Sequence, residues 1–73
     1  MKKINKLASI VKEKRKKLGF TQEELAKRAG VGLRFIRDLE QGKDSLQLNK
    51  VDQVLNLFGL EMNPVRKNYE NEP

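Results

Sequence analysis

The sequence predicts an all-α fold, a small four-helix bundle, with one short β-strand at its C-terminal end. Two observations predict the helices: apolar residues recur at intervals of three and four in four segments, and a glycine follows each segment. A third observation predicts the strand, because the apolar spacing beyond Gly59 changes to every second residue. We expect one domain over residues 1–65 and a flexible polar tail over residues 66–73.

The first helix is expected over about residues 5–18, and Gly19 ends it. Its apolar face has helical spacing and consists of Ile4, Leu7, Ala8, Val11 and Leu18. Lysines cover the other faces, so the apolar face is expected to pack against the rest of the domain.

The second helix, residues 22–29, has a strong start signal. Thr21 offers an N-cap hydroxyl and Glu24 follows three residues later, which completes a capping box. Gly30 is expected to end the helix, because glycine adopts a left-handed backbone that a side chain opposes.

The third helix is expected over residues 33–41, ending at Gly42. It follows Gly32, a weaker cap than serine, so packing is expected to fix its entry. Two short helices that cross at a tight turn need apolar or small residues at the positions of Leu25, Ala26, Ala29, Val31, Ile36 and Leu39. This pattern is typical of a DNA-binding helix-turn-helix. It leaves an outward face consisting of Leu33, Arg34, Arg37 and Asp38.

Residues 43–48 are expected to form a polar loop before a fourth helix that ends at Gly59. Asn49 offers an N-cap for this helix. Its apolar stripe consists of Val51, Val54, Leu55 and Phe58.

The period-two residues after this helix predict a strand over about residues 60–65. Pro64 is compatible with an edge strand only. Because a lone strand is unstable, we expect it to pair with the same strand of a second subunit about a two-fold axis. The residues predicted for this homodimer contact are Phe58, Leu60, Met62 and Val65.

The chain contains no cysteine and no histidine, which excludes disulfides, thiolate zinc sites, thiol nucleophiles and histidine bases. The remaining candidate groups form no recognisable catalytic cluster: Ser9, Ser45, Tyr69 and scattered carboxylates. We therefore expect no enzyme, no metal and no cofactor. Neither a bilayer-spanning apolar stretch nor a secretory signal is evident, so a cytoplasmic location is expected.

The formal net charge of +6 is unevenly distributed. Residues 1–37 hold twelve Lys or Arg against three Glu, whereas residues 38–73 hold four against seven acids. A basic half suits a polyanion such as nucleic acid, and an acidic half suggests a different role for the other end. Lysine runs are also common on solvated helix faces, so charge alone leaves both interpretations open.

In a helix-turn-helix, the N-terminal part of the second helix meets base edges in the major groove. The residues predicted to do so are Gly32, Leu33, Arg34 and Arg37. Arginine can donate two hydrogen bonds to guanine, although phosphate contact, or for Arg37 a pair with Glu40 or Gln41, is an alternative. Leu33 either touches a thymine methyl or packs on a neighbouring helix. Phe35 either packs beneath the first helix or reaches the DNA.

Phosphate contacts are predicted where cations or a helix N-terminus flank these residues. Gln22 can place its amide, together with the N-terminus of its helix, against a phosphate. The predicted set is Thr21, Gln22, Lys16, Lys17, Gln41 and Lys43, with the two neighbouring lysines belonging to the basic run over residues 12–17.

Three runs carry a resemblance to a known class: TQEELAKRAGV, FIRDLEQGK and KVDQVLNLFGLEM. They resemble the Xre and lambda-repressor class of helix-turn-helix proteins, and within it the HipB-type antitoxins, over about residues 5–65. The resemblance implies a homodimer with paired C-terminal strands, binding to palindromic double-stranded DNA operators, and association with a HipA-like serine/threonine kinase toxin. By position it implies the same base-contact set, with Gln22 on a phosphate. Gly32 has no side chain, so specificity would depend on its neighbours.

The sequence therefore favours a DNA-binding autorepressor that also neutralises a toxin kinase. One alternative is a stand-alone or phage-type repressor without a toxin partner. Another is a protein-interaction module in which the helix-turn-helix serves only for packing and the acidic half binds a basic partner.

Overall fold

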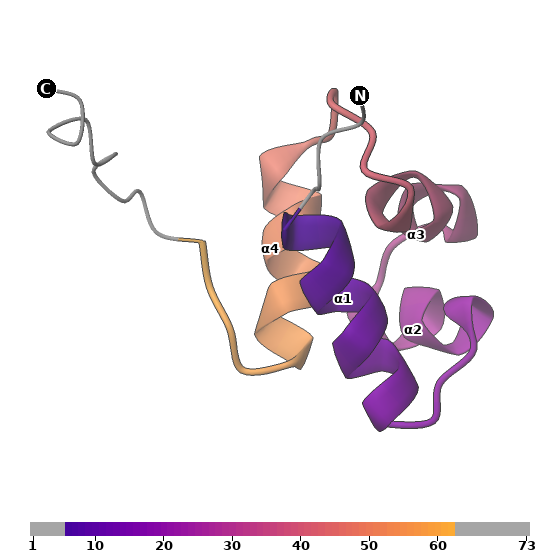
Figure 1. Cartoon of the computed structure of the whole chain (residues 1–73). Helices are drawn as coiled ribbons and strands as arrows, with labels where there is room; N and C mark the ends of the chain where they lie inside the picture. The colour runs from indigo at the N-terminus through magenta and orange to yellow at the C-terminus, as the bar shows by residue number, and fades with distance from the viewer. Residues whose placement is uncertain (1–5, 63–73) are drawn as a thin grey trace, which may run out of the picture.

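The computed structural model describes residues 6–62 and contains four helices, as the sequence predicted. In chain order they are α1 (Lys6–Lys17), α2 (Gln22–Ala29), α3 (Leu33–Glu40) and α4 (Leu48–Leu57). Figure 1 shows α2 and α3 on one side of the domain, α4 on the opposite side, and α1 in front of them.

The helices enclose one core, and each contributes buried side chains to it. The fully buried large side chains are Val11, Leu25, Ile36, Leu39, Val51 and Val54. They come from the apolar faces that helical spacing predicted, because residues three and four apart share one face. The apolar core therefore fixes the crossing of α2 over α3.

The first helix is shorter than expected, and this changes the role of Leu18. The helix ends at Lys17, and Leu18 is 54% exposed rather than packed on the domain. Its backbone N–H still donates to the carbonyl oxygen of Lys14 at 3.1 Å. The chain then turns through Gly19, which directs the Leu18 side chain away from the core.

Both predicted caps of α2 are present. Thr21 Oγ1 accepts a hydrogen bond from the Glu24 N–H at 3.0 Å, and Glu24 Oε1 accepts one from the Thr21 N–H at 2.8 Å. At the other end Gly30 has φ 75°, in the left-handed region. Its N–H donates to the carbonyl oxygens of Ala26 and Lys27. Backbone groups at both ends of α2 are thus satisfied.

We expect Thr21→Ala to lower the free energy of unfolding by about 1 kcal/mol, because the substitution removes the acceptor for the Glu24 N–H. Urea denaturation followed by circular dichroism measures the change. Ser45→Ala is the matched control, since Ser45 is exposed and lies outside every helix. Equal stability of both variants would contradict the capping role.

The start of α4 differs from the prediction. Asn49 was expected as the N-cap, but α4 begins at Leu48 and Gln47 occupies the cap position without a side-chain hydrogen bond. The buried side chain of Val51 lies three residues after Leu48. Packing rather than side-chain capping therefore sets the entry of this helix.

Residues 60–62 form no strand in the described part of the chain. The Leu60 N–H donates to the carbonyl oxygen of Leu55 at 2.8 Å, which holds this segment beside the end of α4. The remainder of the predicted strand, with Val65, and the predicted tail lie outside the described residues. Phe58, expected at a dimer contact, is half-buried and packs against the core of its own subunit. No helix within residues 6–62 has the length and apolarity to cross a bilayer.

Candidate nucleic-acid interface

The outward face of α3 presents two arginines that the fold does not use. Arg34 and Arg37 are exposed, and neither makes an ion pair or side-chain hydrogen bond within residues 6–62. They lie three residues apart on one helix, so their side chains share a face. Their guanidinium groups are therefore available to an external acceptor such as a base edge or a phosphate.

Two other residues of the predicted base-contact set lie at the start of α3 and behave differently. Gly32 is exposed, and a Cβ added there would meet no atom within 4 Å. Leu33 was expected to face outward, but it is partly buried and packs against the core. The crossing of the helices turns it inward, which is the packing alternative raised above. Phe35 is also half-buried against the core.

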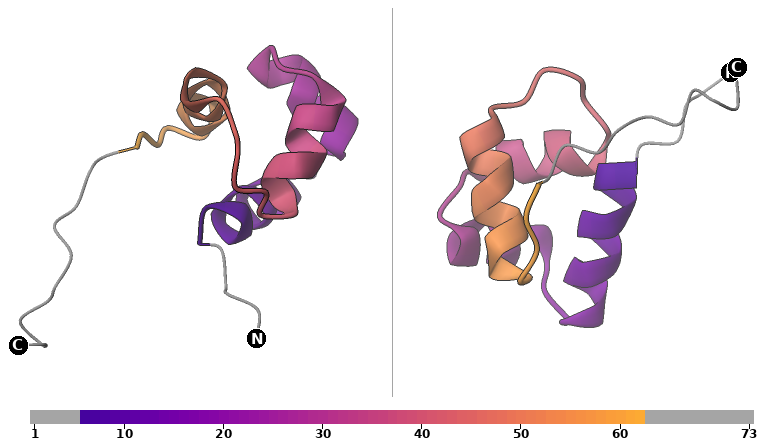
Figure 2. Two further views of the ribbon diagram at one scale, coloured as in Figure 1. Left: turned by 90° about the horizontal axis from the view of Figure 1, so that it is seen from above. Right: turned by 90° about the vertical axis from the view of Figure 1, so that its left-hand side faces the viewer.

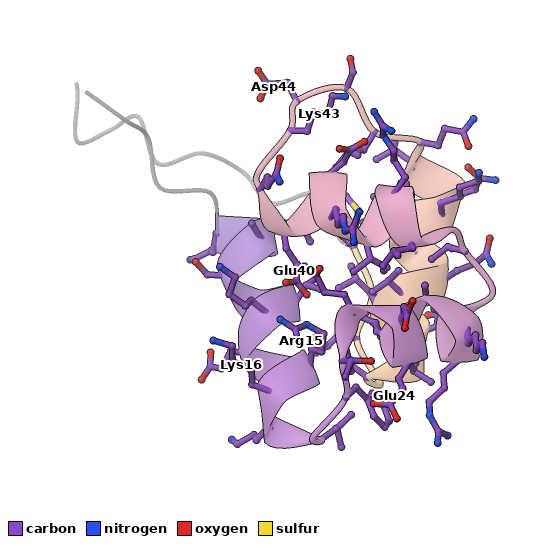
Figure 3. The ribbon with its side chains drawn as sticks, turned by 90° about the vertical axis from the view of Figure 1, so that its right-hand side faces the viewer. Arg15, Lys16, Glu24, Glu40, Lys43 and Asp44 are labelled. Atoms are coloured by element: carbon purple, nitrogen blue, oxygen red, sulfur yellow. The ribbon has the colours of Figure 1, made fainter. Side chains whose placement is uncertain are left out.

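A buried ionic network joins α1, α2 and α3. Arg15 Nε donates to Glu40 Oε2 at 2.7 Å, and a terminal nitrogen of Arg15 donates to Glu40 Oε1 at 3.1 Å. The side chains of Arg15 and Glu40 are only 13% and 2% exposed. Arg15 also donates to the carbonyl oxygen of Phe20 at 2.9 Å. Figure 3 shows Arg15 and Glu40 pointing toward each other between α1 and the other two helices.

The environment of Glu40 has two opposing effects on its pKa. Burial raises the pKa, whereas hydrogen bonds from Arg15 and Gln22 and the positive charges of Arg15 and Lys12 lower it. The net result is a pKa below the ordinary value. Glu40 is thus a carboxylate at neutral pH. Arg37, for which Glu40 was one possible partner, is left unpaired by this arrangement.

Gln22 belongs to the same network. Its Nε2 atom donates to Glu40 Oε1 at 3.1 Å, which fixes the side-chain amide at the first residue of α2. A primary amide nitrogen carries two hydrogens. One is used by Glu40, so the second remains for an acceptor outside the domain. The adjacent helix N-terminus also favours an anion.

The remaining predicted phosphate-contact residues surround this region. Thr21 is exposed at the N-cap of α2, and Lys16 and Lys17 are exposed in the last turn of α1. Gln41 is exposed at the C-cap of α3. Lys43 follows it and is also exposed, with Nζ 3.6 Å from Asp38 Oδ2. In Figure 3, which looks onto α2 and α3, Lys16 lies on α1 and Lys43 in the loop beyond α3.

The buried pair was not predicted, although the sequence contains a signal for it. Arg15 lies four residues after Val11, and Glu40 lies four residues after Ile36. Both charged residues thus continue the buried face of a helix. A charged residue on such a face needs a partner, because an unpaired buried charge is costly. The inward positions therefore indicated that each charge needs a partner, and local spacing does not identify which one.

A further contact secures the turn between α2 and α3. Gln53 on α4 donates from Nε2 to the carbonyl oxygens of Ala29 and Gly30 at 3.1 and 3.3 Å. This amide satisfies carbonyl groups at the C-terminal end of α2, which have no partner within the helix. This contact attaches α4 to the turn that precedes α3.

Comparison with known proteins agrees with this geometry. The model of the helix-turn-helix family matches residues 11–64. An uncharacterised HTH-type transcriptional regulator of Sinorhizobium fredii is 51% identical over 53 residues, covering 73% of this chain and 70% of that protein. A second one, of Methanothermobacter thermautotrophicus, is 40% identical over 55 residues, covering 75% of this chain and 80% of that protein.

Solved structures give the same result. A chain of the HipA–HipB–O2–O3 complex is similar with a TM-score of 0.72 and 30% identity, over 93% of this chain and 100% of that chain. A chain of the HipB–O4 20mer complex is similar with a TM-score of 0.73 and 30% identity, over 93% of this chain and 100% of that chain. The structural neighbours are thus HipB antitoxins, and the chain belongs to the helix-turn-helix family, in its Xre-type branch.

Proposed function

We propose that this protein is a sequence-specific repressor that binds a palindromic double-stranded DNA operator as a homodimer. The observation that carries the proposal is the pair of exposed, unpaired arginines, Arg34 and Arg37, on the outward face of α3. In this proposal they read base edges, with Gly32 and Leu33 beside them at the start of the helix. The likeness to HipB in complexes with O2, O3 and O4 supports the same role.

The proposed phosphate contacts flank α3 and orient it. Gln22 contributes the amide that Glu40 fixes, and the charged contributions come from Lys16, Lys17 and Lys43. Thr21 and Gln41 add hydrogen-bonding groups at the ends of α2 and α3. A dimer with such contacts displaces counterions from several phosphates, so its affinity depends steeply on salt.

We further propose that the repressor is the antitoxin of a toxin–antitoxin pair, which autoregulates its operon and neutralises a HipA-like serine/threonine kinase. The support is the likeness to a chain of the HipA–HipB–O2–O3 complex over 93% of the present chain. A stand-alone repressor without a toxin is the second candidate. It requires only the exposed arginines on the outward face of α3 and no protein partner.

The DNA proposal is tested by selecting sites from a random duplex pool and measuring affinity against salt concentration by fluorescence anisotropy. We expect a palindromic consensus and a loss of affinity by orders of magnitude between low and moderate salt. Affinity that is insensitive to salt and to sequence would leave the interaction-module interpretation instead.

The toxin proposal is tested by capture of the tagged protein from its native cells, with nuclease treatment to remove bridging DNA. Mass spectrometry then identifies proteins bound in stoichiometric amount. A kinase-like protein supports the antitoxin role. Recovery of this protein alone, as a homodimer that shifts operator DNA, favours the stand-alone repressor.

A further inference from the structure

One side chain of α4 holds the turn that connects α2 to α3. Gln53 Nε2 donates to the carbonyl oxygen of Ala29 at 3.1 Å and to that of Gly30 at 3.3 Å. A Cβ added at Gly30 would lie 3.4 Å from the same nitrogen, so the amide rests against this glycine. The right panel of Figure 2 shows α4 in front, with the connection from α2 to α3 passing beside it. A residue of α4 thus contacts the backbone at the point where the chain leaves α2.

The amide of Gln53 matches the groups that it contacts. The last carbonyl groups of a helix have no partner within the helix, and they form its partially negative end. A primary amide nitrogen carries two hydrogens, so it can serve both carbonyl oxygens at once. An apolar side chain of similar length would leave both oxygens without this donor.

The connection has few restraints of its own. It consists of Gly30, Val31 and Gly32, and glycine permits more backbone conformations than any other residue. The N–H groups of Gly30 and Val31 donate to carbonyl oxygens of α2, which attaches the turn to that helix. Gly32, the N-cap of α3, makes no side-chain hydrogen bond. The hydrogen bonds from Gln53, together with the partial burial of Val31, therefore tie the connection to the rest of the bundle.

The same connection sets the position of the first turn of α3. This helix begins at Leu33, so Arg34 is its second residue, whereas Arg37 is one turn further on. The later turn is held by Ile36 and Leu39, whose side chains are fully buried. A side chain that reads a base must be held to within about 0.5 Å by its supporting contacts. A shift of the connection would therefore displace Arg34 more than Arg37.

We propose that Gln53 is a positioning residue for base recognition by Arg34. The inference rests on the proposed function, in which Arg34 reads a base edge, and it adds a determinant of specificity outside α2 and α3. Gln53 acts through the backbone of Ala29 and Gly30. Its own helix lies on the opposite side of the domain from α3 (Figure 1). Gln53 therefore has no place among the DNA contacts themselves.

The test measures the affinity of the full chain for the selected operator, for its single-base variants and for random duplex DNA by fluorescence anisotropy. Gln53→Met removes the donor and keeps the length of the side chain. At the base pair that Arg34→Ala identifies, we expect discrimination to fall about fivefold, the smaller loss expected for an arginine that donates two hydrogen bonds to guanine. Affinity for random DNA is expected to stay unchanged, because the proposed phosphate contacts lie outside α4.

Asn56→Met is the matched control. Asn56 is an exposed amide on the same helix, and its side chain makes no hydrogen bond within residues 6–62. We expect this substitution to leave discrimination unchanged. A role of Gln53 in stability alone would lower the free energy of unfolding, measured by urea denaturation, but would leave the discrimination of the folded protein as in wild type. That result, or an equal fall in Asn56→Met, would overturn the proposal.

A rescue experiment uses Gln53→Lys, which keeps a donor. A lysine ammonium near the C-terminal end of a helix can donate to its last carbonyl groups, so we expect discrimination to return toward the wild-type value. The added charge strengthens binding to all sequences alike, and discrimination is a ratio of affinities, so the charge cancels. Asn56→Lys controls for this charge. Discrimination by Gln53→Lys as low as that by Gln53→Met would contradict the donor role.

A double substitution separates this inference from the proposed function. If Gln53 acts through Arg34, Gln53→Met causes no further loss of discrimination at that base pair in an Arg34→Ala background. An additional loss of the same size would show that the two residues act independently. A wild-type chain without sequence preference would reject the proposed function together with this inference. Preference in wild type that persists undiminished in Gln53→Met would reject the inference alone.

Discussion

Glu40→Ala is expected to lower the free energy of unfolding by about 3 kcal/mol, because removal of one partner leaves a buried charge unpaired. The unpaired group is Arg15, whose side chain is only 13% exposed. Gln22 also loses its acceptor. Domains of this size have total stabilities of about 4–11 kcal/mol, so the loss is a large fraction of the total. The change is measured by urea denaturation at neutral pH.

The control for this substitution is Glu13→Ala. Glu13 is an exposed acid on α1 with no ion pair or side-chain hydrogen bond in the described part of the chain. We expect its replacement to change stability by less than about 0.5 kcal/mol. If Glu40→Ala were no more destabilising than Glu13→Ala, the pair with Arg15 would not hold the helices together.

The same network predicts a dependence of stability on pH. The pKa of Glu40 is lowered in the folded chain. The contribution of its carboxylate to the free energy of unfolding is therefore fully present at pH values above the pKa in the unfolded chain, about 4.3 for glutamate. The contribution is lost as the pH falls through the folded pKa. Glu40→Gln removes the titrating group. We therefore expect the stability difference between wild type and Glu40→Gln to shrink as the pH falls below about 4.3.

Arg34→Ala is expected to relax sequence preference at particular bases of the selected operator. An arginine that donates two hydrogen bonds to guanine discriminates by about 1–3 kcal/mol, which is roughly fivefold to 150-fold in affinity. Arg34 is exposed and unpaired within residues 6–62, so its replacement leaves no buried group without a partner. Affinities for the consensus and for single-base variants, measured at one salt concentration, give the discrimination.

Lys16→Ala is the matched comparison, because Lys16 is exposed at the end of α1 and is proposed to contact phosphate. We expect it to weaken binding to all sequences alike and to reduce the slope of affinity against salt. Loss of affinity by Arg34→Ala that is equal on consensus and random DNA would reject base reading by Arg34. A phosphate contact would then be its role.

A comparison of Glu40→Ala with Arg34→Ala separates the network from the proposed interface. Glu40 is buried and pairs with Arg15 of α1, whereas Arg34 lies on the outward face of α3. Substitution of Glu40 is expected to lower the free energy of unfolding. It is also expected to lower DNA affinity, because Gln22 loses the acceptor that positions its amide. Substitution of Arg34 acts on base preference without a matching loss of stability.

The sequence by itself determined the four helices and both ends of α2. The capping box of Thr21 and Glu24 and the left-handed turn at Gly30 depend on residues within four positions of each other. The buried faces follow from residues three and four apart on one helix. These interactions are local, so they can be predicted from spacing alone.

Tertiary structure alone decided which distant residues meet. Arg15 and Glu40 are 25 positions apart, and Gln53 reaches carbonyl groups more than 20 positions away. Their contacts depend on the angles and distances at which the helices cross, which no local pattern encodes. The same crossing turns Leu33 inward and commits Gln22 to Glu40. Spacing predicted the surface that we propose binds DNA, but packing of the whole bundle selected the side chains that remain free on it.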